Sequence, residues 1–150
     1  MLSVFDVVLY ILIKIESTTA MKLQKLVYYC QAWSIVWDEE ALFKEEIEAW
    51  ANGPVVKELY EEHRGMYEIK INSKVAKLGD VTKLTKEQID TIDAVLEYYN
   101  GMSPQEISDL THAEDPWQNA RMGLPDGERG DQIITKASLE EYYSSLNKDS

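Results

Sequence analysis

The sequence predicts a mainly α-helical fold, a compact single-domain bundle of about six helices with a small β element. Apolar residues recur at helical spacing in several segments, and capping residues precede most of these segments. Only one stretch alternates clearly between apolar and polar residues. The length of 150 residues and the hydrophobic share of 45% fit one packed core, so we treat residues 1–150 as a single domain.

Two helices are predicted in the N-terminal part of the chain. Ser3 and Asp6 form a capping box in front of an apolar run that ends at Ile15. The next helix carries apolar residues on one arc, namely Leu23, Leu26, Val27, Cys30, Trp33 and Trp37. Residues that lie outside this arc are Lys22, Gln24, Lys25, Tyr28 and Gln31. We therefore expect one apolar face on this helix.

The middle of the chain predicts mixed structure. A short extended piece is expected at 47–50, and Pro54 is expected to open a helix that runs to His63, because proline suits a first helical turn. After this helix, apolar residues alternate with polar ones, which predicts a half-buried strand. Its apolar residues are Tyr67, Ile69 and Ile71.

Three capped helices and a terminal helix are predicted in the second half. The expected starts are Thr85 with Gln88, Ser103 with Pro104 and Glu106, and Asp115 with Pro116, the last helix reaching Met122. Apolar residues at helical spacing then mark a C-terminal helix, namely Leu139, Tyr142, Tyr143 and Leu146. Glycine-rich 123–131 is expected to be a mobile loop, and 147–150 a polar tail.

Candidates for catalysis or metal binding are few. The only histidines, His63 and His112, have no carboxylate or thiol at a spacing typical of metal ligands. Cys30 lies on an apolar helix face, where cysteines are mostly inert. We therefore predict no catalytic, metal-binding or cofactor-binding residues. An acid/base pair of His112 and Asp115 is the remaining enzymatic alternative, which the expected capping role of Asp115 weakens.

The net charge of -12 argues against a broad phosphate-binding surface and favours a basic partner. Helical spacing places Asp90, Asp93 and Glu97 side by side, either as an interaction face or as a solvated one.

The apolar run at 7–13 is too short for a membrane helix, and a single cysteine gives no sign of secretion. We expect a cytoplasmic protein that binds neither membrane nor nucleic acid directly.

Aromatic residues near two predicted corners are candidates for partner binding. The first group is Thr111, His112 and Trp117, and the second is Trp50 with Tyr60. Exposed tryptophans often anchor protein interfaces. The alternative is structural, with Trp117 packed on the core and His112 bonded to the backbone.

Three strings together resemble one known family: MKLQKLVYYCQAW from Met21, EAWANGPVVKELY from Glu48, and LTHAEDPWQNAR from Leu110. The chain resembles a stand-alone Panacea domain, the SocA-like antitoxin domain also called phage-associated GepA protein. The resemblance implies a mostly helical domain that neutralises a protein toxin, typically encoded by the adjacent gene, through direct contact. It carries over no catalytic residues. The resemblance also implies that a relative can hand a toxin to a protease, so an adaptor for an ATP-dependent protease is the alternative.

Overall fold

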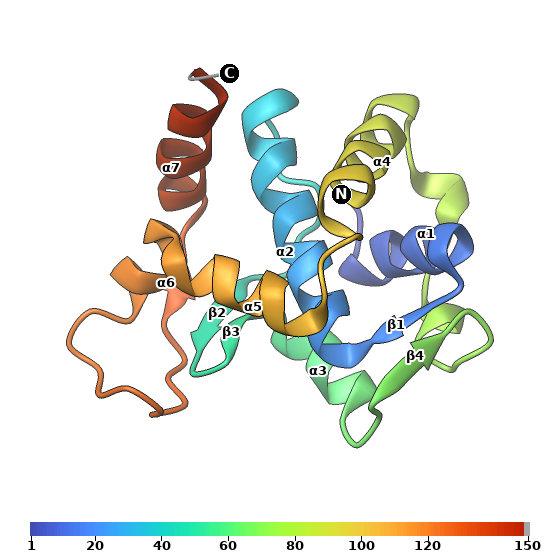
Figure 1. The fold of residues 1–150 in the computed structure, drawn as a ribbon. Helices are drawn as coiled ribbons and strands as arrows, with labels where there is room; N and C mark the ends of the chain where they lie inside the picture. The colour runs from blue at the N-terminus through green and yellow to red at the C-terminus, as the bar shows by residue number, and fades with distance from the viewer. Residues whose placement is uncertain (149–150) are drawn as a thin grey trace.

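The computed structural model describes residues 1–148, and most of these residues are helical (Figure 1). The helices are α1 (Val4–Ile15), α2 (Ala20–Trp37), α3 (Lys57–His63), α4 (Lys86–Tyr99), α5 (Pro104–Ala113), α6 (Asp115–Ala120) and α7 (Lys136–Lys148), with short 3-10 helices η1 (Ala76–Leu78) and η2 (Val81–Lys83). The strands are β1 (Ser17–Thr19), β2 (Ile47–Trp50), β3 (Gly53–Val55), β4 (Glu68–Lys70) and β5 (Ile133–Ile134). The predicted mainly α-helical fold is thus confirmed.

Helix α2 lies at the centre of the domain and packs against α4, α5 and α7 (Figure 1). Because neighbours cover it on several sides, it is buried beyond the predicted apolar arc. Gln24, Lys25 and Gln31 are each only 2% exposed. The Gln31 amide is satisfied by the backbone, since its Oε1 accepts from Leu42 N at 2.7 Å and its Nε2 donates to Phe43 O at 3.0 Å.

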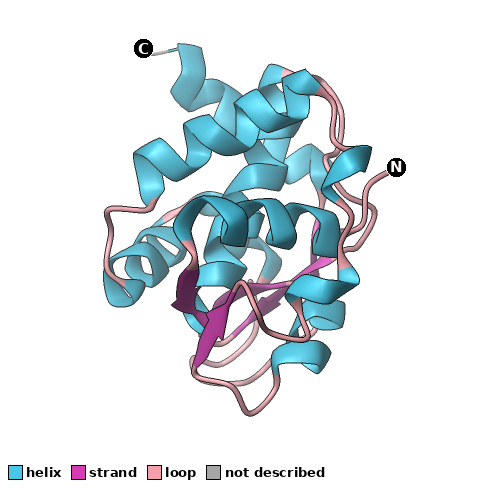
Figure 2. Ribbon diagram, turned by 90° about the vertical axis from the view of Figure 1, so that its right-hand side faces the viewer, coloured by secondary structure: helices cyan, strands magenta, loops and turns pink. Residues whose placement is uncertain are grey.

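The strands form two small antiparallel sheets at one end of the helices (Figure 2). β1 pairs with β4, and β2 lies between β3 and β5. The prediction that Pro54 opens a helix is wrong. Pro54 pairs with Ala49 in the edge strand β3, where its missing N–H breaks no ladder bond, and α3 begins at Lys57.

The predicted strand near Tyr67 is confirmed only in part. β4 contains three residues, and Ile69 alone faces the core with 0% exposure. Tyr67 and Ile71 lie just beyond its ends and are 81% and 38% exposed. The strand is too short for the alternation to bury all three side chains.

Capping boxes at Ser3, Thr85 and Ser103 are confirmed. The cap predicted at Asp115 is wrong, because Glu114 occupies that position and Asp115 is the first helical residue. Helix α6 also ends at Ala120, before Met122.

Residues 123–131 contain no helix or strand, as expected, and their mobility stays a prediction. Of the predicted tail 147–150, residues 147 and 148 end α7, while 149 and 150 lie outside the described residues.

Candidate functional site

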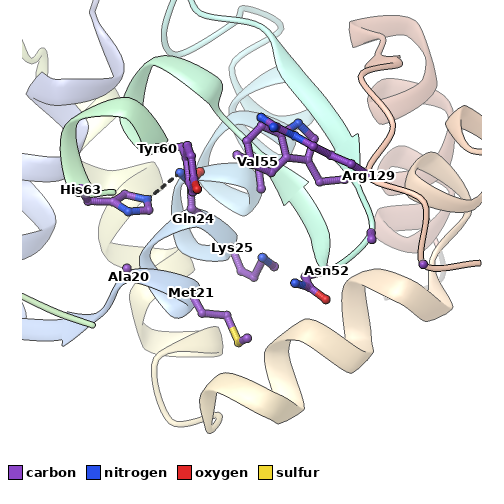
Figure 3. Close-up of a pocket in the computed structure, with 12 residues that line it drawn as sticks. Ala20, Met21, Gln24, Lys25, Asn52, Val55, Tyr60, His63 and Arg129 are labelled. Carbon is purple, nitrogen blue, oxygen red and sulfur yellow. Dashed lines mark hydrogen bonds between the residues drawn. The ribbon is translucent and has the colours of Figure 1, made fainter. Parts of the chain in front are cut away.

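A cavity of about 400 Å³ opens between α2, α3 and the β2–β3 hairpin, and the 123–131 loop adds Gly127 and Arg129 to its wall (Figure 3). It is lined by Ala20, Met21, Gln24, Lys25, Trp50, Ala51, Asn52, Val55, Tyr60, His63, Gly127 and Arg129. None of these residues is acidic, although the chain has 27 Asp and Glu residues. The cavity is therefore a basic and aromatic site in an acidic protein.

Lys25 is the unusual residue of this cavity. Its side chain comes from α2 and points across the cavity toward Asn52 (Figure 3). The residue is 2% exposed, yet its ammonium forms no hydrogen bond or ion pair with any residue of 1–148. Burial lowers the pKa of Lys25 from its ordinary 10.5 to about 8. The side chain is thus largely buried, and its ammonium reaches the cavity without a protein partner.

Gly53 permits the backbone of the hairpin to lie directly on the Lys25 side chain. A Cβ atom at Gly53 would lie 2.6 Å from Lys25 Cε and 3.3 Å from Thr111 Oγ1. The φ of Gly53 is +124°, a conformation that other residues rarely adopt. Glycine is therefore favoured here by its conformation, and a Cβ atom would also push the flexible end of the Lys25 side chain aside.

Trp50 and Tyr60 form an aromatic wall of the cavity. Their rings meet edge to face with centroids 4.9 Å apart, and the Arg129 guanidinium lies 4.0 Å above the Trp50 ring. Such a cation–π contact places a second positive charge at the cavity mouth. Trp50 Nε1 donates to Glu48 Oε1 at 2.9 Å, which fixes the indole in the wall.

His63 closes the far side of the cavity and is buried. Gln24 Oε1 accepts from Val56 N at 2.9 Å, so the amide nitrogen of Gln24 faces His63 Nε2 at 3.0 Å and donates to it. Burial, together with the positive charge of Lys25, lowers the pKa of His63. His63 is therefore a neutral acceptor at pH 7.

The corner between α5 and α6 adjoins this cavity. Trp117 Nε1 donates to Trp50 O at 2.8 Å, and the Trp117 ring stacks on His112 with centroids 4.2 Å apart. His112 Nε2 is buried without a hydrogen-bond partner in the described chain. Thr111 is 0% exposed and donates to Ser108 O at 2.7 Å, so it supports the corner from inside.

The structure divides the predicted site residues into two groups. Trp50, Tyr60, Thr111, His112 and Trp117 lie in or beside the cavity region, whereas the three acidic residues lie on α4. On α4, the Tyr10 hydroxyl donates to Asp93 at 2.7 Å, Lys86 pairs with Asp90 at 3.0 Å, and Glu97 is exposed.

The sequence prediction missed Lys25, Gly53 and Arg129 as parts of the site. A lysine outside the apolar arc of a helix usually points to solvent, so Lys25 carried no sequence signal. The signal that did exist was the pair Gly53 and Pro54, which we interpreted as a helix start.

We expect the Lys25→Met variant to be more stable than the wild type near pH 7.5, because methionine removes the buried charge. The pKa of Lys25 is lowered in the folded state, so the unfolded state binds more protons between pH 8 and 10.5, and the wild type gains stability over this range. The stability advantage of the variant should therefore shrink by about 2 kcal/mol between about pH 7.5 and about pH 9.5.

Urea unfolding of both proteins at several pH values measures this difference. Cys30 and the tyrosines, which also titrate in the unfolded chain, contribute equally to both proteins and cancel. Burial and, to a smaller extent, the charge of Lys25 lower the pKa of His63 and of His112, so both are already neutral at these pH values. Lys77→Met, at an exposed site, is the matched control and should show no such change. A constant difference for Lys25→Met would contradict the prediction.

Arg121 holds the loop that carries Arg129. This guanidinium is 7% exposed and donates to the carbonyl oxygens of Ala49 at 2.8 Å and Arg129 at 3.0 Å, and also to those of Pro125 and Glu128. We expect Arg121→Met to raise the rate of proteolytic cleavage within 123–131 by at least about tenfold, because these carbonyls lose their donor. Arg64→Met, at an exposed site, should leave the cleavage rate unchanged. Equal rates for both variants would exclude this role of Arg121.

Cys30 is fully buried, and burial raises the pKa of its thiol. Within residues 1–148, no cluster of three or more His, Cys, Asp or Glu side chains is placed to hold a metal ion. No helix among these residues has the length and apolar character needed to cross a membrane.

Comparison with known proteins identifies the family. No curated protein and no solved structure matches the chain. Residues 23–118, more than half of the sequence, match the family described as Antitoxin SocA-like, Panacea domain. The matched range includes Lys25, the β2–β3 hairpin, Tyr60 and the α5–α6 corner. The chain therefore belongs to the SocA-like antitoxin family of Panacea domains.

Proposed function

We propose that this protein is the antitoxin of a toxin–antitoxin system and neutralises a cognate protein toxin, encoded by the adjacent gene, by binding it directly in the cytoplasm. Membership of the SocA-like antitoxin family is the observation that carries this proposal. The net charge of -12 supports it, because toxins that act on RNA or nucleotides are often basic, and opposite charges speed association.

The surface around Trp50 is the proposed contact region. Trp50 is half-buried, lies beside Tyr60 and is linked through its carbonyl to Trp117, so aromatic side chains from three elements converge there. Aromatic residues and arginine are enriched in the energetic centres of interfaces. The acidic side chains of α4, Asp90, Asp93 and Glu97, form a second proposed surface that guides a basic toxin.

A non-enzymatic mechanism accompanies this proposal. The His112 ring stacks on Trp117, which covers one face of the imidazole. Asp115 follows at the start of α6, but no hydrogen bond joins the two side chains within the described residues. An acid/base pair therefore has no geometric support, and His112 stays a proposed partner contact beside Trp117.

Co-expression with the product of the neighbouring gene tests the proposal. We expect restored growth and co-purification of the two proteins. Trp50→Ala should weaken both growth rescue and co-purification, whereas Tyr67→Ala, which removes an 81% exposed ring next to β4, should weaken neither. Absence of rescue and of co-purification would contradict the proposal. A shortened toxin half-life that depends on an ATP-dependent protease would instead support the adaptor alternative.

A further inference from the structure

The cavity beneath the β2–β3 hairpin has the features of a ligand site in its own right. It holds the buried ammonium of Lys25, which has no partner among residues 1–148, and its wall contains no acidic side chain. We propose that this cavity binds an oxyanion, a carboxylate or a phosphate, that is attached to an apolar or aromatic body, with Lys25 as the group that holds the anion.

The charge argument begins with the cost of burying Lys25. A largely buried side chain disfavours its ammonium form, and cations at such sites in proteins are normally paired. Folding places Lys25 there, and Gly53 leaves the space that its side chain needs. An oxyanion in the cavity would supply the missing partner, and Arg129 at the mouth adds a second positive charge.

The apolar part of the ligand is inferred from the walls. Trp50, Tyr60, Val55 and Met21 surround the space, and Asn52 adds one amide beside Lys25 (Figure 3). A volume of about 400 Å³ lies within the range of small-molecule sites, which are mostly apolar with a few placed polar groups. Inorganic phosphate alone would leave these apolar walls without contacts, so an organic anion fits better.

The same chemistry can come from a free small molecule or from an acidic side chain of a bound protein. The first part of the test uses small probes with the purified protein alone, namely benzoate, phenyl phosphate and the neutral analogue benzyl alcohol. Binding is followed by the NMR signal of the Trp50 indole N–H and by the melting temperature. This part contains no toxin, so its outcome is independent of the proposed antitoxin function.

We expect benzoate or phenyl phosphate, but not benzyl alcohol, to shift the Trp50 signal saturably and to raise the melting temperature. Lys25→Met should weaken this binding by at least about tenfold, whereas Lys77→Met should bind as the wild type does. Wild-type affinity should also fall several-fold at pH 9, where Lys25 is largely neutral, while Arg129 keeps its charge and His63 and His112 are already neutral. Tyr60 is the remaining titratable group in the wall, and Tyr60→Phe should show the same fall.

The proposal is overturned if neither anion binds, if benzyl alcohol binds equally well, or if Lys25→Met retains wild-type affinity. The second part, which rests on the proposed function, identifies the source of the anion. If benzoate competes with the toxin and Lys25→Met weakens the complex, the toxin supplies the acidic group. If neither benzoate nor the Lys25→Met substitution changes the affinity for the toxin, the ligand is a free organic anion.

Discussion

Replacing Glu114 with alanine is expected to lower the free energy of unfolding by about 4 kcal/mol. Glu114 is 6% exposed, and its Oε1 accepts hydrogen bonds from the hydroxyls of Tyr29 at 2.6 Å and Tyr143 at 2.8 Å. The Tyr143 hydroxyl also lies 2.9 Å from that of Tyr28. These bonds join α2 and α7 to the start of α6, so the alanine variant leaves a buried network without its acceptor.

Urea unfolding measures this loss. Glu114→Gln keeps an acceptor oxygen and should lose only about half as much, because it gives up the charge-assisted part of each bond. Glu140→Ala, at an exposed position of α7, is the control and should change stability by less than about 0.5 kcal/mol. A loss below about 1 kcal/mol for Glu114→Ala would show that the network does not hold these helices together.

The second large effect is expected for Gly53→Ala, at about 3 kcal/mol of destabilisation. Alanine is strained at a φ of +124°, and its Cβ would lie 2.6 Å from Lys25 Cε. The substitution therefore combines backbone strain with displacement of the flexible end of the Lys25 side chain. Either the hairpin or the Lys25 side chain must move, so we also expect weaker binding of the anionic probes.

Two other glycines separate the causes of this effect. Gly65 has a φ of +86° with open space around it, so Gly65→Ala measures strain alone. Gly101 has neither a positive φ nor a close neighbour, so Gly101→Ala should be nearly neutral. In a Lys25→Ala background, Gly53→Ala should cost about as much as Gly65→Ala. If Gly53→Ala destabilises the wild type no more than Gly65→Ala does, the close approach to Lys25 Cε adds nothing to the loss of stability.

The sequence predicted local features of the fold well, because local contacts determine them. The boxes at Ser3, Thr85 and Ser103 each join residues three positions apart, and all three begin helices in the structure. Pro54 shows the limit of such reasoning, since proline also suits an edge strand, and only pairing with β2 decides between the two.

The cavity was harder to predict because distant segments create it. Lys25 is buried because the hairpin at Gly53 packs on it. The spacing of residues within α2 cannot predict contact with a hairpin that lies about 30 residues further along the chain. Aromatic residue type did indicate Trp50, Tyr60 and Trp117, which lie close together in the structure. The N-cap of α6 was predicted one residue late, because aspartate is a common N-cap residue; Glu114 occupies the position, and its carboxylate binds Tyr29 and Tyr143 instead of capping the helix.

Titration of the purified toxin with this protein tests the proposed function most directly, with toxin activity measured in the absence of ATP and protease. Direct neutralisation predicts that inhibition rises in proportion to added antitoxin, becomes complete at a fixed molar ratio, and yields a complex that can be isolated. Full inhibition by a small fraction of one equivalent, or full activity at any excess, would contradict it.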